Sequence, residues 1–89
     1  MYEVRFSPDA EKDLSKLEQQ TAKRIVKFLH ERIANIDNPR ALGKSLKGEE
    51  LGKYWRYRVG DYRIICEIQD NQLVVLVITV GHRRDIYRH

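Results

Sequence analysis

A hairpin sequence at residues 54–69, YWRYRVGDYRIICEIQ, decides the fold of this chain. Within it, WRYRV alternates aromatic or apolar side chains with arginines, which is the period-two pattern of a strand with one buried face. The pair Gly60–Asp61 that follows is a turn signal, and YRIICEIQ reads as a second strand. We therefore expect two antiparallel strands, at residues 54–59 and 62–69, joined by a tight turn.

The sequence on either side of the hairpin extends it into a sheet. Asp70-Asn71-Gln72 is another turn signal, and the apolar run at residues 73–80 predicts a third strand of the meander. This strand is apolar at nearly every position, so we expect it to be central and covered on both faces. Residues 2–6 alternate apolar and polar and predict one more strand near the N-terminus.

Two helices are predicted between the first strand and the hairpin. Ser7 suits an N-cap and Pro8 suits the first helical position, and apolar residues at helical spacing carry this helix to about Leu17. An apolar stripe predicts a second helix over residues 21–36, which the Asn38–Pro39 pair ends.

These elements define one α+β domain over residues 1–89, in the order β-α-α-β-β-β. The expected architecture is a four-stranded antiparallel sheet with a helical hairpin packed on one face and a short C-terminal tail. Residues 39–53, which contain several glycines and lysines, are expected to be a loop with little internal structure.

The net charge of +4 is unevenly distributed along the 89 residues. Residues 1–38 contain seven Lys or Arg and seven Asp or Glu, whereas residues 39–89 contain ten bases and six acids. A neutral half joined to a basic half suggests a scaffold that carries a polyanion-binding surface. The alternative is an ordinary small basic domain with no polyanionic ligand.

The single cysteine and the hydropathy pattern exclude several classes. Cys66 lies in an apolar run and reads as a buried structural thiol, and there is no Cys/His spacing typical of a metal site. No N-terminal segment resembles a signal peptide, and the longest apolar run is too short to span a bilayer. We expect a cytoplasmic protein with no cofactor.

The arginines of the hairpin are the first candidate site. Period-two alternation places Arg56 and Arg58 on one face of the sheet, and Arg63 can lie near them across the turn. Three guanidinium groups on one face repel one another unless an anion joins them, and phosphate is the natural ligand for the guanidinium fork. The alternative is a solvated face on which Asp61 and Glu67 are the partners.

A second candidate site follows the last predicted strand, in GHRRDIY at residues 81–87. His82 can titrate near neutral pH, Tyr87 can donate or accept a proton, and Arg83 can stabilise negative charge. The alternative is a frayed basic terminus. The lysines Lys44, Lys47 and Lys53 could add phosphate contacts, or could belong to a solvated loop.

Taken together, the two arginine-rich runs, the LKG sequence at residues 46–48 and the order of elements resemble the RelE family of bacterial toxins, within the RelE/ParE superfamily. The resemblance covers essentially the whole chain. It implies a toxin of a type II toxin–antitoxin pair that enters the ribosomal A site and cuts mRNA. In that reaction the ribose 2′-hydroxyl attacks the adjacent phosphate, without a metal ion.

The resemblance also implies roles for individual residues. Arg63 matches a phosphate-binding arginine, Arg83 an arginine that stabilises the transition state, and Tyr87 a tyrosine that stacks on or activates the nucleotide. Arg56 stands where some relatives have a catalytic lysine, and Tyr54 replaces another. Because arginine does not deprotonate, Arg56 can supply charge but not act as a base, which leaves His82 or Tyr87 for proton transfer. The further residues expected to contact RNA are Arg58, Lys44, Lys47, Lys53 and Arg84.

Two other functions remain open, and the partners differ between them. A ParE-like toxin would inhibit DNA gyrase without cutting RNA, and a chain that has lost its activity would only bind its antitoxin. For the ribonuclease, the expected partners are a RelB-like antitoxin, the ribosome and mRNA. The antitoxin is expected to wrap the toxin with a helix and an extended acidic segment that neutralises its positive charge.

Overall fold

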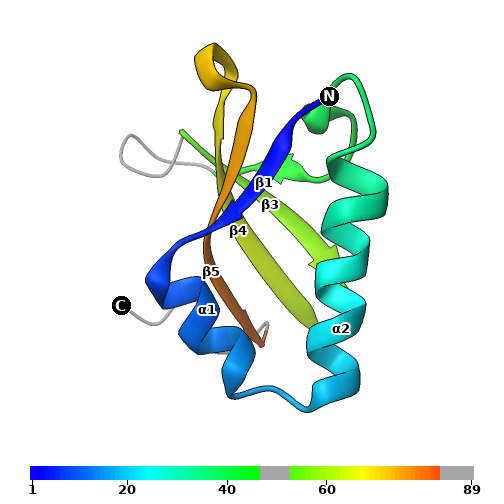
Figure 1. Cartoon of the computed structure of the whole chain (residues 1–89), viewed down its shortest axis with the longest axis vertical. Helices are drawn as coiled ribbons and strands as arrows, with labels where there is room; N and C mark the ends of the chain where they lie inside the picture. The colour runs from blue at the N-terminus through cyan, green and yellow to red at the C-terminus, as the bar shows by residue number, and fades with distance from the viewer. Residues whose placement is uncertain (47–52, 83–89) are drawn as a thin grey trace.

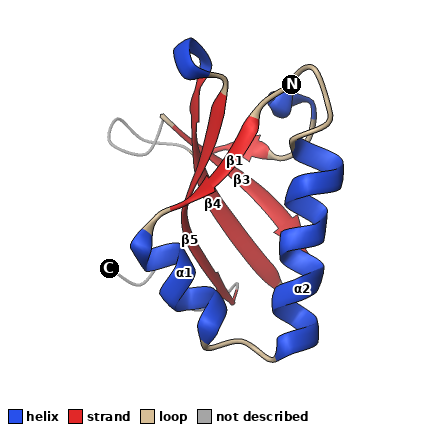
Figure 2. Cartoon of the chain, in the orientation of Figure 1, coloured by secondary structure: helices blue, strands red, loops and turns tan. Residues whose placement is uncertain are grey.

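The computed structural model describes residues 1–46 and 53–82, which form a five-stranded sheet with two helices on one of its faces (Figures 1 and 2). The elements in chain order are β1 (Glu3–Phe6), α1 (Pro8–Ser15), α2 (Gln19–Phe28), a π-helical turn (Leu29–Ile33), a 3-10 turn (Pro39–Ala41), β2 (Lys44–Ser45), β3 (Tyr54–Val59), β4 (Tyr62–Gln69), a second 3-10 turn (Asp70–Gln72) and β5 (Val74–His82). The α+β class and the helices on one face are as the sequence predicts. None of the helices in the described ranges is long and apolar enough to cross a membrane.

The sheet has the strand order β1-β5-β4-β3-β2, and β1 runs parallel to β5. The prediction of a four-stranded antiparallel sheet was therefore wrong in the number of strands and in the direction of β1. Alternation of apolar and polar residues identifies a strand but contains no information on its neighbour or direction. Because two helices follow β1, the chain crosses the sheet before it returns, which permits a parallel pair.

The predicted hairpin is confirmed in both of its strands and in its turn. β3 and β4 occupy the expected residues, and Gly60 in the turn has a φ of +58°, a conformation that favours glycine. β5 lies inside the sheet between β1 and β4, as expected for its apolar sequence. It begins one residue late, because Leu73 adopts a left-handed conformation with a φ of +54°, and it continues to His82.

The core lies between the sheet and the helices. Ile25, Leu29 and Ile33 are fully buried on α2 and the π-helical turn, and they belong to one apolar cluster with Tyr57 and Val77 of the sheet. The two helices do not lie side by side: α1 runs along β5, and α2 lies over β3 (Figure 1). Both lie on the same face, so no helix within residues 1–46 and 53–82 covers the other face of β5.

The helix boundaries follow the capping chemistry more closely than the apolar stripes. Ser7 is the N-cap of α1, as predicted: its Oγ accepts a hydrogen bond from the amide of Ala10 at 3.0 Å and donates one to the carbonyl of Ile78 at 2.8 Å. α1 ends at Ser15, two residues before the expected end. α2 begins at Gln19 and changes to a π-helical turn at Leu29, so the predicted helix to residue 36 was too long.

The segment from Pro39 to Ser45 is structured, contrary to the prediction of a plain loop. Two aromatic side chains of β3 hold it in place: Trp55 Nε1 donates to the carbonyl of Leu42 at 2.7 Å, and the Tyr57 hydroxyl donates to the carbonyl of Pro39 at 2.6 Å. As a result Lys44 and Ser45 pair with β3 as the short strand β2.

Candidate functional site

Four basic residues lie next to one another on the sheet, and we call them the cationic row. Lys44 of β2 is the direct ladder partner of Arg56 on β3, and Arg58 of β3 is the direct partner of Arg63 on β4. Direct partners in an antiparallel ladder point to the same face, and residues two apart on a strand do so as well. All four side chains therefore project from one face of three neighbouring strands.

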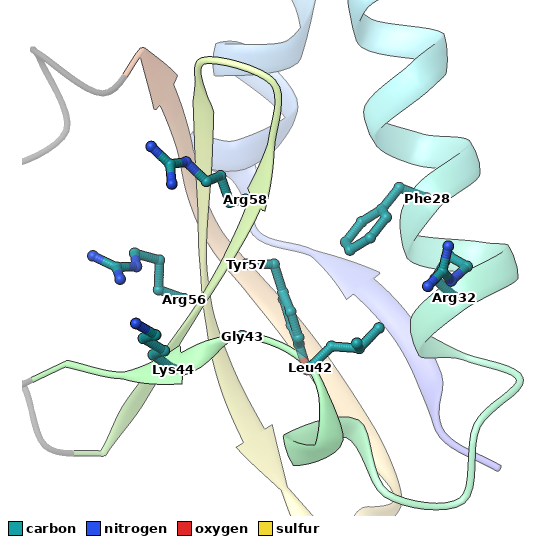
Figure 3. Close-up of a pocket in the computed structure, with 8 residues that line it drawn as sticks. All are labelled: Phe28, Arg32, Leu42, Gly43, Lys44, Arg56, Tyr57 and Arg58. Atoms are coloured by element: carbon teal, nitrogen blue, oxygen red, sulfur yellow. The ribbon is translucent and has the colours of Figure 1, made fainter.

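This face is the one opposite the helices. Figure 3 shows Lys44, Arg56 and Arg58 pointing away from Phe28 and Arg32, which belong to α2 and the π-helical turn. The alternate residues of β3, Tyr57 and Val59, are buried against the helices. The predicted division of the strand into an arginine face and an apolar face is confirmed.

The spacing of the cationic row suits phosphate groups. Direct partners have their Cβ atoms about 4.5–5.5 Å apart, and Arg56 and Arg58 are separated by about 6.8 Å along the strand. Like charges placed directly opposite each other destabilise a sheet. An anion between them removes that repulsion, and guanidinium groups bind phosphate through two parallel hydrogen bonds.

Carboxylates do not neutralise Arg58 within the described part of the chain. Glu67 accepts a hydrogen bond from Gln69 Nε2 at 3.5 Å, and it pairs with Tyr54 in the ladder rather than with an arginine. Asp61 lies in the turn and is exposed. Arg58 is exposed, whereas Arg56 and Arg63 are half-buried and the Nε atom of Arg63 is buried.

His82 lies at the end of β5 but not in the cationic row. It is the ladder partner of Tyr62, and the two rings meet edge to face with centroids 5.7 Å apart. The preceding pair, Gly81 and Arg63, points to the other face of the sheet. His82 therefore lies one ladder position from the Arg63 pair, but its side chain projects from the opposite face of the sheet.

Other predicted site residues lie at the margin or outside the described ranges. Lys53 is exposed, and its ammonium group lies 5.1 Å from the centroid of the Tyr54 ring, a cation–π contact. The residues outside the described ranges are Lys47, Arg83, Arg84 and Tyr87. Within the described ranges, no group of His, Cys, Asp and Glu side chains has an arrangement that could hold a metal ion.

The structure adds one basic residue, Arg32, that the sequence analysis did not select. A hollow of about 300 Å³ at the outer edge of β3 is lined by Phe28 and Arg32 on one side and by Lys44, Arg56 and Arg58 on the other (Figure 3). Arg32 lies on the polar side of the second predicted helix, where a basic residue is usually a solvated one. Only the position of that helix over β3 reveals that it faces the edge of the sheet.

The comparisons with known proteins agree with this architecture. A family model described as the ParE toxin of the type II toxin–antitoxin system parDE matches residues 4–87. The toxin RelG of Mycobacterium tuberculosis (strain ATCC 25618 / H37Rv) is 36% identical over 87 residues, which cover 98% of this chain and 97% of that protein.

The chain belongs to the RelE family of the RelE/ParE toxin–antitoxin superfamily. The toxin RelE of the same Mycobacterium tuberculosis strain is 33% identical, over 98% of this chain and 87% of that protein. The crystal structure of the toxin–antitoxin complex RelBE2 from Mycobacterium tuberculosis contains a chain that matches with a TM-score of 0.83 and 33% identity, over 94% of this chain and 93% of that one. The family model has the ParE name while these relatives have the RelE and RelG names, so both branches of the superfamily are represented.

Proposed function

We propose that this RelE-family protein is a ribosome-dependent endoribonuclease that cuts mRNA in the A site and so inhibits translation. The cationic row supports this proposal most directly, because four basic side chains on adjacent strands form a surface for successive phosphates of a single-stranded RNA. The relatives named RelE and RelG support the choice of this branch over the ParE branch.

The reaction that we propose at this surface is a transesterification at phosphorus within the RNA. The ribose 2′-oxygen attacks the adjacent phosphorus, the bond from phosphorus to the 5′-oxygen breaks, and a 2′,3′-cyclic phosphate remains. Negative charge increases on the phosphate oxygens during the attack, so fixed guanidinium groups lower the barrier. We assign Arg63 to the reacting phosphate with Arg58 beside it, and Arg56 and Lys44 to charge stabilisation and the neighbouring phosphate.

Proton transfer requires residues outside the cationic row. The 2′-hydroxyl must lose a proton and the leaving 5′-oxygen must gain one. Because His82 shares its face with Tyr62, we assign this role first to Tyr87 and second to His82. Arg83 is assigned to the transition state. The proposed additional RNA contacts are Arg84, Lys47 and Lys53.

We further propose that a RelB-like antitoxin binds this toxin and covers its basic surface. The matched RelBE2 structure is a toxin–antitoxin complex, and the positive charge of this chain suits an acidic partner. The ribosome and mRNA, the other proposed partners, place its action in the cytoplasm.

The test is cleavage of mRNA on translating ribosomes by the purified full chain. We expect cuts at A-site codons with no divalent cation added beyond that in the ribosome buffer. We expect the Arg63→Ala variant to make no such cuts. Arg5→Ala is the matched control, because Arg5 lies on β1 at the far edge of the sheet and pairs with Glu3. A folded protein that leaves mRNA uncut on the ribosome would overturn this function.

A second candidate function is inhibition of DNA gyrase, which the match to the ParE family model favours. A supercoiling assay separates the two candidates. Inhibited supercoiling with intact translation would establish the ParE-like activity, and normal growth under overproduction without an antitoxin would instead indicate an inactive chain.

A further inference from the structure

Two adjoining hollows lie between α2 and the outer edge of β3. The first has a volume of about 300 Å³ and is the one drawn in Figure 3. The second has a volume of about 320 Å³ and continues the first toward the β3–β4 turn. Phe28, Arg32 and Arg58 line both hollows, so the two form one site, which we call the double hollow.

The first hollow has an aromatic and apolar wall where α2 faces β3. Phe28 is half-buried and lies across the hollow from Leu42 and Tyr57 (Figure 3). Its ring meets the Tyr57 ring edge to face, with the centroids 6.1 Å apart and the planes at 61–90° class geometry of an edge contact. This contact orients the Phe28 ring, and the part of the ring that lines the hollow is available to a flat ligand. Aromatic side chains in such positions stack nucleobases.

The second hollow has a basic wall. Arg24 and Lys27 of α2 and Arg32 of the π-helical turn line it, and Glu31 is the one carboxylate among its described lining residues. Within residues 1–46 and 53–82, no carboxylate forms an ion pair with any of these three cations. Arg24 lies one helical turn before Phe28, about 6 Å along the helix axis. An aromatic wall with cations one turn away suits a ligand that joins a flat ring to an anionic chain.

The protein backbone bounds the double hollow at both ends. At one end Gly43 crosses β3 so closely that a Cβ atom there would lie 2.3 Å from the carbonyl oxygen of Arg56. At the other end is the β3–β4 turn, where Nη1 of Arg24 lies 3.6 Å from the position of a Cβ atom on Gly60. The four residues of β3 between these ends, 56–59, span about 13 Å. A compact ligand of that length fits the site better than a polymer that continues past it.

We propose that the double hollow binds a nucleoside triphosphate. The base stacks on Phe28 in the first hollow, and the phosphates lie among Arg24, Lys27 and Arg32 in the second. Guanidinium groups bind phosphate through two parallel hydrogen bonds, and the ligand supplies the negative charge that these cations lack. The site differs from the RNA surface, because the side chains of the cationic row that Figure 3 shows point away from Phe28. The inference therefore goes beyond the proposed function and does not depend on it.

Isothermal titration calorimetry of the full chain with ATP tests this proposal. Adenosine and inorganic triphosphate are the two half-ligands, and EDTA in every titration keeps the probes free of metal ions. We expect ATP to bind ~10-fold or more tightly than either half-ligand, because only ATP occupies both hollows. Equal affinities for ATP and inorganic triphosphate would overturn the base site. Absence of ATP binding at millimolar concentration would overturn the whole proposal.

Amino-acid substitutions separate the two halves of the site. Phe28→Leu keeps an apolar side chain in the core but removes the flat ring, so it should weaken ATP binding by ~5-fold or more and change triphosphate binding by ~2-fold at most. R24Q/K27Q should weaken the binding of both probes by ~10-fold or more. The matched control K12Q/K16Q removes two exposed charges elsewhere and should change either affinity by ~2-fold at most. Equal weakening by the two double variants would overturn the site, because net charge alone would then explain the binding.

Backbone amide shifts in NMR spectra locate the ligand and identify its source. ATP should shift the amides of Phe28 and Gly60 and leave that of Arg5 unchanged. A single-stranded RNA oligonucleotide has the same base and phosphate chemistry, so it is titrated in parallel. RNA that shifts the amides of Phe28 and Gly60 while ATP does not would overturn the inference. If the chain cuts no mRNA on the ribosome, the proposed function fails, whereas the ATP titrations still decide the double hollow.

Discussion

Arg58 and Arg63 are direct cross-strand partners in the β3–β4 ladder, so two guanidinium groups are held side by side on the same face of the sheet. Lys44 of β2 and Arg56 of β3 form a second like-charged pair, two residues before Arg58 on β3. A sheet selected for stability alone would place opposite charges or β-branched residues at such positions. The arrangement fits the RNA-binding role that we propose for this surface.

Replacement of Arg58 by threonine should therefore stabilise the protein and weaken RNA binding. Removing one charge of the pair should raise the free energy of unfolding by about 0.2–1 kcal/mol, measured by urea denaturation. The affinity for single-stranded RNA should fall, and the slope of log K against log salt should decrease by about 0.7. Arg5→Thr on β1 is the control, and an unchanged salt slope in Arg58→Thr would remove Arg58 from the RNA surface.

Replacement of Asp13 should loosen the end of β5. Its Oδ2 accepts hydrogen bonds from Thr79 Oγ1 at 2.8 Å and from the backbone amide of Val80 at 3.0 Å. Asp13→Ala leaves that amide without its acceptor, so we expect a loss of about 1–3 kcal/mol in the free energy of unfolding. Asp13→Asn retains an acceptor and should lose less. Glu11→Ala, exposed on the same helix, should be within about 0.5 kcal/mol of the original protein, and an equal loss there would contradict the assignment.

Gly43 and Gly60 form a matched pair for a test of close packing. Both have a positive φ, of +78° and +58°. A methyl group at position 60 meets only the end of Arg24 at 3.6 Å, whereas at position 43 it meets backbone at 2.3 Å. Gly60→Ala should cost about 1–2 kcal/mol from backbone strain, and Gly43→Ala should cost more, because β2 must also move away from β3. Thermal denaturation measures both, and similar losses would argue against the close approach at Gly43.

Stability should decline at alkaline pH. Burial raises the pKa of the Cys66 thiol above its ordinary 9.0, and burial, together with the nearby Cys66, raises the pKa of the Tyr57 phenol above its ordinary 10.0. Both groups ionise first in the unfolded chain, so the stabilisation is complete below about pH 9 and declines above it. Each ionising group should contribute a fall of up to about 1.4 kcal/mol per pH unit.

Cys66→Ala isolates the thiol contribution to this pH dependence. Urea denaturation between about pH 8 and pH 10.5 should show a shallower decline for the variant, whatever its lower starting stability. The same decline in both proteins would show that Cys66 is not the titrating group.

The central hairpin could be predicted from sequence because two independent signals coincide there. Alternation defines both strands, and Gly60 defines the turn between them. The short strand β2 has no such signal. It exists because Trp55 and Tyr57 bind the carbonyls of Leu42 and Pro39, and contacts between residues 13 and 18 positions apart leave no periodic pattern.

The residues of the candidate site were also predictable only in part. Alternation along one strand was sufficient to place Arg56 and Arg58 together, and a tight turn brought Arg63 opposite Arg58. The hollow at the outer edge of β3 depends on where α2 lies relative to β3, so Arg32 looked like an ordinary solvated residue in the sequence. His82 shows the limit of proximity along the chain, because the register turns its ring away from Arg63.

The parallel pairing of β1 with β5 has a consequence for synthesis of the protein. Glu3 pairs with Val74, so the first strand waits for a partner that is 71 residues later in the chain (74 − 3). Contacts so distant in sequence form late in folding. The sheet therefore closes only after β5 has left the ribosome that makes the chain, so β1 has no partner strand while the residues between the two strands are being made.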